Sequence, residues 1–340
     1  MTIDNLEKEL KQGKLNSLYL LYGEEQYLLD NNVKKIKSLF GNYEKGINYI
    51  KIDAQNVMNI ISDVETPSFG YEKKLIIARN TGLFKNEGKK KNVEISNLRD
   101  KLAQYISENM EIIDDSVVLV FVESDIDARL SIFKTIDKQG VTCKFDFQRT
   151  PQIASRMKVV CDAYKVNIDG STMSYFIESC GTNMQELINE IRKLIEYAGP
   201  GGTIKKEDID KLSTKKLESI IFDLTDNLGK KQIAKAMEIL NDLIYKKEPI
   251  ELIMVVLYNH FKKLYLCKIA LSSGKDIVTA LKLKPNQTFL VNKYKMQSNS
   301  FVERDLRNIL QDLINLDYEY KIGLIDNKVG LDTILCKYCS

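Results

Sequence analysis

The stretch Leu18–Asp30, which reads LYLLYGEEQYLLD, decides how the first part of the chain folds. Its five apolar or aromatic residues predict a buried strand, Gly23 predicts a tight turn, and the residues after it begin an amphipathic helix. A strand, a glycine turn and a helix in this order are the frame of a phosphate-binding loop. Whether the loop functions depends on the residues that follow the glycine.

A working phosphate loop has the pattern G-x-x-x-x-G-K-[ST], in which backbone N–H groups surround the phosphates and a lysine meets their charge. Counted from Gly23, the second glycine position holds Leu28, the lysine position Leu29 and the hydroxyl position Asp30. Two leucines and a carboxylate would repel a triphosphate. We therefore expect a degenerate loop without nucleotide, and no cofactor.

Predicted strands and helices alternate over residues 1–150. The strands are Ser17–Tyr22, Ile47–Asp53, Lys74–Arg79, Val117–Glu123 and Val141–Phe147, and the helices after the first one are Asn56–Val64, Val93–Ile106 and Ala128–Lys138. The strand from Val117 is continuously apolar, as expected where helices cover both faces of a sheet. This alternation predicts a doubly wound, mainly parallel sheet, the RecA-like sheet of an AAA+ module.

The pattern becomes helical around Pro151. We expect a small helical lid domain at 151–212, whose clearest helix is Asn183–Ala198, and a helical domain at 213–340. Within the latter, Ile250–Leu271 is apolar on most of its circumference, which predicts either deep burial or a subunit interface. A further helix is expected at Phe301–Leu324. The predicted fold is thus α/β followed by all-α.

Composition describes a soluble protein of several domains. The 340 residues are 44% hydrophobic and 29% charged, with a net charge of +3 that does not by itself indicate nucleic-acid binding. No apolar run approaches the roughly 18 residues of a membrane span. Acidic residues near the N-terminus argue against a signal peptide, and six scattered cysteines fit a reducing compartment. We expect a cytoplasmic protein.

Few residues are candidates for catalysis or metal binding. The strand that ends at Glu123 continues with Ser124 and Asp125, not with the Asp-Glu pair that holds Mg²⁺ in an active ATPase, so we expect Glu123 to be a solvated strand end. His260, the single histidine, is expected to be packed or interfacial. Cys336 and Cys339 form a lone C-x-x-C without a second pair, and we expect no metal site.

The loop Pro67-Ser68-Phe69-Gly70-Tyr71 lies between a predicted helix and a predicted strand. An exposed aromatic residue on a constrained loop suits a pocket of a partner protein, where one anchor contributes more than ~2 kcal/mol. The alternative is that Phe69 folds back onto its own domain.

Several short motifs resemble the delta subunit of the bacterial DNA polymerase III clamp loader, and their order and spacing extend over essentially the whole chain. They are the stretch Leu18–Asp30, Glu65–Gly70 followed by Lys73–Ile77, Gly181–Met184, Glu190–Leu194 and Ile221–Leu224. The resemblance implies a subunit that binds the sliding clamp (the beta subunit) and helps open it for loading onto primed DNA. It also implies a C-terminal collar that joins the ATPase and delta-prime subunits.

In this family the position of Phe69 resembles the hydrophobic plug that wedges into the clamp. Many members have a leucine before the phenylalanine, where this chain has Ser68. The resemblance makes the chain part of a nucleotidyltransferase holoenzyme, with no catalytic activity expected in the isolated chain.

Two alternatives remain open from the sequence: a divergent P-loop NTPase, and an autonomous DNA-binding protein. Lys89, Lys90 and Lys91 have two interpretations: they contact the DNA backbone, or they belong to a solvated loop. A second basic group is interleaved with Phe289 and Tyr294, whose rings either stack on single strands or pack in the core. Its lysines are Lys282, Lys284, Lys293 and Lys295.

Overall fold

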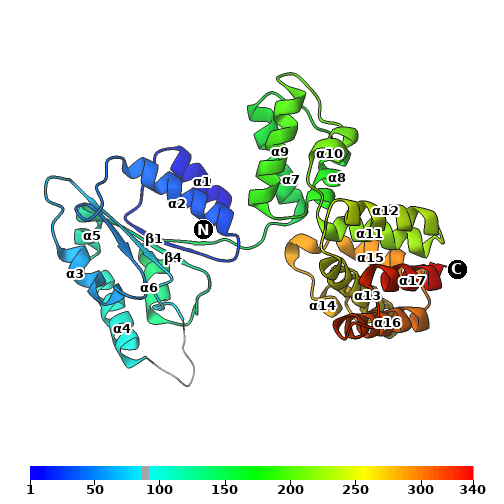
Figure 1. The fold of residues 1–340 in the computed structure, drawn as a ribbon. Coiled ribbons are helices and arrows are strands. Elements are labelled where there is room, and N and C mark those ends of the chain that lie inside the picture. Colours follow the sequence, from blue (N-terminus) through cyan, green and yellow to red (C-terminus); the bar gives the residue numbers. More distant parts are fainter. Residues whose placement is uncertain (86–91, 340) are drawn as a thin grey trace. The chain divides into compact units, whose positions relative to one another are not determined.

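The computed structural model describes residues 1–85 and 92–339. The chain divides into two compact units, Met1–Phe147 and Gln148–Ser340 (Figure 1). The assignment of residues 1–150, 151–212 and 213–340 to three functional domains stays a prediction. Among the described residues, no helix is long and apolar enough to cross a membrane.

The first unit is built on a five-stranded sheet in the order β2-β3-β4-β1-β5, in which all neighbouring strands are parallel. The strands are β1 (Leu18–Tyr22), β2 (Tyr49–Ile52), β3 (Lys74–Arg79), β4 (Val117–Glu123) and β5 (Val141–Lys144). Because successive strands run parallel, each connection must return from the end of one strand to the start of the next, and each of the four connections contains a helix. The predicted RecA-like parallel sheet is confirmed.

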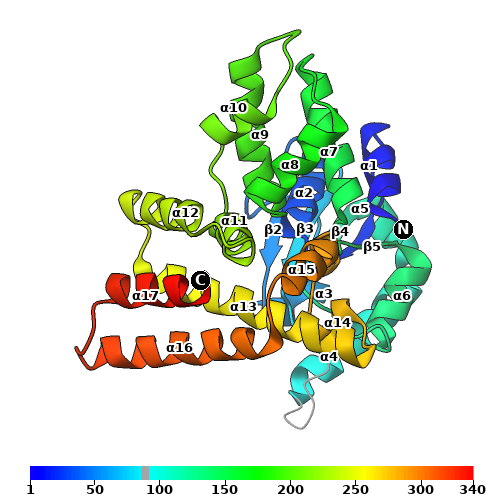
Figure 2. The same cartoon turned by 90° about the vertical axis from the view of Figure 1, so that its right-hand side faces the viewer.

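Helices cover both faces of this sheet, so that β4 is buried along its whole length (Figures 1 and 2). One face packs against η1 (Val57–Asn59), α3 (Ile60–Glu65), α4 (Val93–Glu108), α5 (Met110–Ser116) and α6 (Ser131–Gln139). The other face carries α1 (Ile3–Lys11) and α2 (Gln26–Phe40). The continuous apolar character of the strands follows from this double coverage.

The sequence pattern missed α1 and α5 and made two strands too long. Helix α1 has nine residues, and only Ile3, Leu6 and Leu10 are buried, which is too short a stripe to stand out from its charged neighbours. Strands β2 and β5 end earlier than predicted. They are the two outer strands of the sheet, so each has only one neighbouring strand to pair with.

The second unit is helical. Its helices are α7 (Thr150–Ala163), α8 (Gly170–Cys180), α9 (Met184–Ala198), α10 (Lys206–Leu212), α11 (Leu217–Gly229), α12 (Ile233–Tyr245), α13 (Ile250–Ser273), α14 (Ile277–Ala280), η2 (Pro285–Gln287), α15 (Leu290–Asn299), α16 (Glu303–Lys321) and α17 (Asn327–Cys339). The predicted helix at Asn183–Ala198 is α9, and Asn183 caps it by accepting a hydrogen bond from the Glu186 N–H at 3.1 Å.

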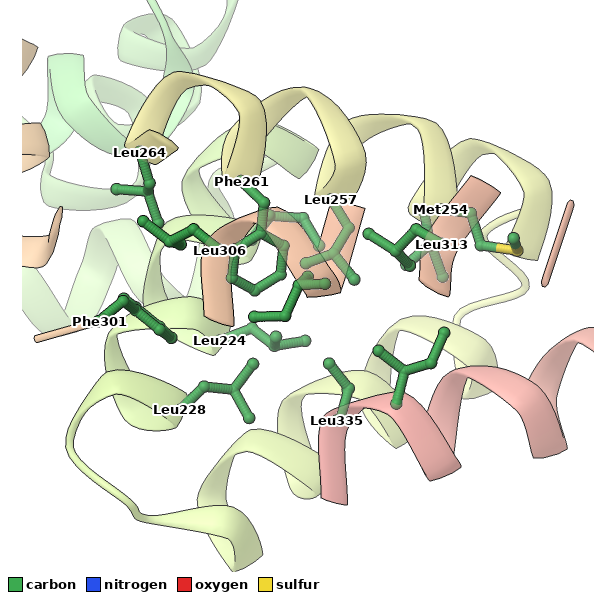
Figure 3. Packing of buried hydrophobic residues seen from close by; sticks show 14 of the residues in the cluster. Leu224, Leu228, Met254, Leu257, Phe261, Leu264, Phe301, Leu306, Leu313 and Leu335 are labelled. Atoms are coloured by element: carbon green, nitrogen blue, oxygen red, sulfur yellow. The ribbon is translucent and has the colours of Figure 1, made fainter. Parts of the chain in front are cut away.

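Helix α13 lies at the centre of the C-terminal bundle (Figure 3). Its Met254, Leu257, Phe261 and Leu264 face buried residues from the helices around it. These include Leu224 and Leu228 of α11, Leu306 and Leu313 of α16, and Leu335 of α17. Of the two alternatives from sequence, deep burial holds for this face, while Leu252 and Val255 at the start of α13 are exposed.

The predicted packing of His260 is confirmed. Its ring is buried beside Phe222 and Tyr294, with centroids 4.3 and 5.5 Å away. The ring Nε2 lies 2.7 Å from Gln297 Oε1 and 2.9 Å from Thr225 Oγ1. Because an amide oxygen only accepts, Nε2 carries the hydrogen. Burial lowers the pKa of His260 to about 4, against which the Gln297 bond acts as a smaller, opposing effect.

We predict that the His260 imidazole titrates with a midpoint near pH 4 in the folded chain. Its unfolded pKa is 6.5, so the unfolded state takes up more protons as the pH falls through this interval. The free energy of unfolding should then decrease by roughly 3 kcal/mol between the two pH values. Since the chain has one histidine, a single imidazole NMR signal reports the titration directly.

The matched control is His260→Gln. In this variant the free energy of unfolding should lack the decrease of roughly 3 kcal/mol over the same pH interval, because the titrating group is gone. A midpoint near the ordinary value of 6.5 in the folded wild-type chain would contradict the prediction.

Candidate functional site

The degenerate phosphate loop is a three-residue turn, Gly23–Glu25, between β1 and α2. Two of its three backbone N–H groups have partners within the protein. Gly23 N–H donates to the Glu123 carbonyl at 3.1 Å, and Glu25 N–H donates to the Phe145 carbonyl at 2.9 Å. A phosphate cradle needs N–H groups that point into open space. In this turn those donors join β1 to the ends of its two neighbouring strands.

Gly23 is required for this close approach. Its φ is +136°, and a Cβ atom added there would lie 2.3 Å from the Phe145 carbonyl oxygen. The glycine therefore serves the packing of the turn against the segment after β5. Close packing against Phe145 thus explains why a glycine stands at position 23, independently of any phosphate.

Leu28, Leu29 and Asp30, which occupy the remaining positions of the phosphate-loop pattern, belong to helix α2. Leu28 and Leu29 are buried on its inner side. Asp30 forms an ion pair with Arg79 at the end of β3, with 2.7 Å between Asp30 Oδ1 and Arg79 Nη2. The two leucines thus contribute to the core, and the carboxylate is held by a protein cation.

The expectation that Glu123 is a solvated strand end is wrong. The side chain is 1% exposed, and its Oε1 accepts hydrogen bonds from Thr81 N–H at 2.9 Å and from Thr81 Oγ1 at 2.8 Å. Burial raises the pKa of Glu123, while the bonds from Thr81 act in the opposite direction. Glu123 links the end of β4 to the segment after β3, a contact between residues far apart in sequence.

The predicted partner-binding loop and the degenerate phosphate loop lie at opposite ends of the parallel strands. Residues 67–71, here called the Phe69 turn, precede β3, whereas Gly23 follows β1. Because β1 and β3 both run parallel to β4, their starts lie at one edge and their ends at the other. The Phe69 turn and the degenerate phosphate loop are therefore separated by the length of the strands.

The Phe69 turn has a defined internal structure. Tyr71 N–H donates to the Ser68 carbonyl at 3.0 Å, and Ser68 Oγ donates to the Tyr71 carbonyl at 2.8 Å. Gly70 adopts φ +79°, a conformation that favours glycine. Phe69, at the tip, is 78% exposed and does not fold back onto its own domain. The Ser68 hydroxyl is used within the turn and shapes the tip that presents Phe69.

Glu44 and Lys74, to which the sequence pattern assigned no role, hold this turn. Tyr71 Oη donates to Glu44 Oε2 at 3.2 Å, which joins the turn to the loop before β2. Lys74, the first residue of β3, is 1% exposed, and its ammonium group bonds to carbonyls at the end of α3. The sequence feature that could have revealed the contact of Lys74 with α3 is a lysine at the start of a continuously apolar strand.

Of the two basic groups considered for DNA contact, the structure describes only the second. Lys89, Lys90 and Lys91 lie outside the described residues. In the second group, Tyr294 is buried in the core, which confirms the packing alternative for that ring. Lys293 pairs with Glu178, with 2.6 Å between Nζ and Oε2.

Two family models match the chain. The model described as "DNA polymerase III, delta subunit" matches residues 19–146, and the model described as "DNA polymerase III delta subunit, C-terminal domain" matches residues 218–338. The first match contains both the degenerate phosphate loop and the Phe69 turn. The second contains most of the helical bundle around α13.

Full-length relatives agree with the family models. The DNA polymerase III subunit delta of Bacillus subtilis is 26% identical over 334 residues, covering 96% of this chain and 94% of the relative. A protein described as "Probable DNA polymerase III subunit delta" from Aquifex aeolicus is also 26% identical, covering 91% and 87%. The structure of the Bacillus subtilis DNA clamp loader delta protein has the same fold, with a TM-score of 0.74 at 24% identity and 99% coverage of both chains. This chain belongs to the family of DNA polymerase III delta subunits.

Proposed function

We propose that this delta subunit binds the sliding clamp through the Phe69 turn and helps open it for loading onto primed DNA, without hydrolysing ATP itself. The observation that carries the proposal is the 78% exposure of Phe69 at the tip of a hydrogen-bonded turn. An aromatic side chain held at the tip of an ordered turn can enter an apolar pocket of a partner, where one such anchor contributes more than ~2 kcal/mol. We propose the cytoplasm as the compartment in which it acts.

Clamp opening follows from differential affinity. A ligand shifts an equilibrium between closed and open rings only by the difference in its affinity for the two. Phe69 would fill an apolar pocket on one clamp subunit, and binding would be tighter when that subunit has the shape it adopts in the open ring. The Phe69 turn limits the conformational entropy lost on binding, since its backbone is already ordered.

The energy of ATP would come from other subunits of the loader. The phosphate-loop N–H groups bonded to Glu123 and Phe145 carbonyls, together with the buried Leu29, support this division of labour. We propose that the C-terminal bundle is the collar that contacts the ATPase and delta-prime subunits. Apolar side chains exposed on it are available for such contacts. They include Leu252 and Val255 of α13, Tyr318 of α16 and Leu324 after it.

We predict that Phe69→Ala weakens equilibrium binding of the purified chain to its sliding clamp at least tenfold. Loss of a buried aromatic anchor typically costs more than ~2 kcal/mol of binding free energy. The free energy of unfolding should change little, because the ring is exposed in the free chain. Calorimetric or optical titration with the clamp measures the affinity, and denaturant unfolding checks the fold.

Tyr245→Ala is the matched control, since Tyr245 is an aromatic residue that is 88% exposed at the end of α12. It should leave clamp affinity unchanged. Binding that survives Phe69→Ala would move the anchor elsewhere. Absence of any clamp binding by the wild-type chain would overturn the proposed function.

We further predict that Mg²⁺ and ATP at millimolar concentration leave the melting temperature of the isolated chain unchanged. A ligand that binds the folded state stabilises it by mass action, so even weak binding at the β1–α2 turn would raise the melting temperature. A concentration-dependent rise would favour the alternative of a divergent NTPase. A clamp-loader ATPase subunit that binds ATP serves as the positive control.

A further inference from the structure

Lys74 is the one lysine among the fully buried large side chains of the described chain. It begins β3, three residues after the Phe69 turn ends, and its neighbours in the strand are apolar. The Nζ atom donates hydrogen bonds to the carbonyl oxygens of Asp63 and Thr66, both at the C-terminal end of α3. A buried ammonium group is costly unless such acceptors compensate it. Among the described residues, the hydrogen-bond acceptors of this ammonium group thus belong to the segment that leads into the turn.

The Asp63 carbonyl needs a donor because of Pro67. In a continuing helix, the carbonyl of residue 63 would accept a hydrogen bond from the N–H of residue 67. Proline has no N–H, and it also drives the preceding residue to an extended conformation. Thr66 is extended, with ψ 128°, so α3 stops there. The Lys74 ammonium takes the place of the donor that Pro67 lacks.

The electrostatics of this contact are favourable. The C-terminal end of a helix carries partial negative charge on its free carbonyl groups, and a cation there is stabilising. The carboxyl group of Asp63 adds a further attraction. Burial lowers the pKa of Lys74 and the Asp63 charge opposes this effect. Burial likewise raises the pKa of Asp63, which Lys74 opposes.

We propose that Lys74 is a positioning residue for clamp binding: by tying the end of α3 to the start of β3, it fixes both ends of the Phe69 turn. The turn leaves α3 at Thr66 and enters β3 at Lys74, so the contact between Lys74 and Thr66 closes the loop at its base. The Ser68 and Tyr71 hydrogen bonds then order its tip. This inference rests on the proposed clamp-binding role of Phe69.

The test is a double-mutant cycle in the full chain, read out as affinity for the sliding clamp. Lys74→Met keeps the length of the side chain but removes the charge and the donors. In the wild-type background it should weaken clamp binding at least about fivefold. In the Phe69→Ala background it should change the affinity less than about twofold, because a residue that acts only by placing Phe69 has nothing left to place.

Lys73→Met is the matched control. Lys73 is the adjacent lysine and also donates to a backbone carbonyl, that of Asp114, away from the Phe69 turn. It should leave the affinity for the clamp unchanged. Equal losses from Lys74→Met in both backgrounds, or no loss in either, would overturn the inference while leaving the role of Phe69 intact. Clamp affinity that Phe69→Ala does not change would instead overturn the proposed binding site, and this inference with it.

Lys74→Arg supplies a second variant that keeps a buried cation if Lys74→Met does not fold. Its bulkier, planar head group cannot reproduce both contacts in the same geometry, so we expect a fold of normal stability and a smaller loss of affinity. Amide hydrogen exchange gives an independent measurement. Exchange should become faster at Thr66 and Tyr71, whose N–H groups bond to Ser62 and Ser68, and stay unchanged in β3 and β4. Unchanged exchange at Thr66 and Tyr71 in a folded variant would contradict a role in ordering the turn.

Discussion

The constraint on which the first unit depends is that all its neighbouring strands are parallel and that helices cover both faces of the sheet. Each connection must then cross from the end of one strand to the start of the next. Loops that follow strands gather at one edge, and loops that precede them gather at the other. The degenerate phosphate loop and the Phe69 turn fall on different edges for this reason alone.

At the end of the strands where a phosphate loop would lie, backbone hydrogen bonds hold the turn after β1. Gly23 N–H and Glu25 N–H donate to the carbonyls of Glu123 and Phe145. Glu123 itself turns inward to Thr81. These contacts join β1 to its neighbours β4 and β5, and they make the edge more rigid than an open loop would be. At this end of the strands Gly23, Glu25 and Glu123 are buried, whereas Glu24 is exposed.

At the other end of the strands, the Phe69 turn holds an exposed aromatic side chain above a base that hydrogen bonds tie together. The base depends on a proline that ends α3 and a buried lysine that satisfies the carbonyl left behind. The tip depends on a serine hydroxyl that bonds within the turn. In the binding role that we propose for Phe69, a backbone that is already ordered lowers the entropy lost on binding.

Local sequence determined the elements with strong periodicity, because these depend on residues close together in the chain. Strands β3 and β4 and helix α9 match their predicted bounds closely, and the identities of Leu28 and Leu29 depart from the phosphate-loop pattern. Short α1 and α5 were missed because two turns of helix carry little periodic signal. Only the tertiary structure decided that Glu123 is buried, that Phe69 is exposed and that Lys74 is enclosed. Glu123 meets Thr81 across 42 residues of sequence, and Lys74 meets Asp63 across a turn. Burial of a polar side chain depends on which partner the fold brings to it, and no pattern within a single segment contains that partner.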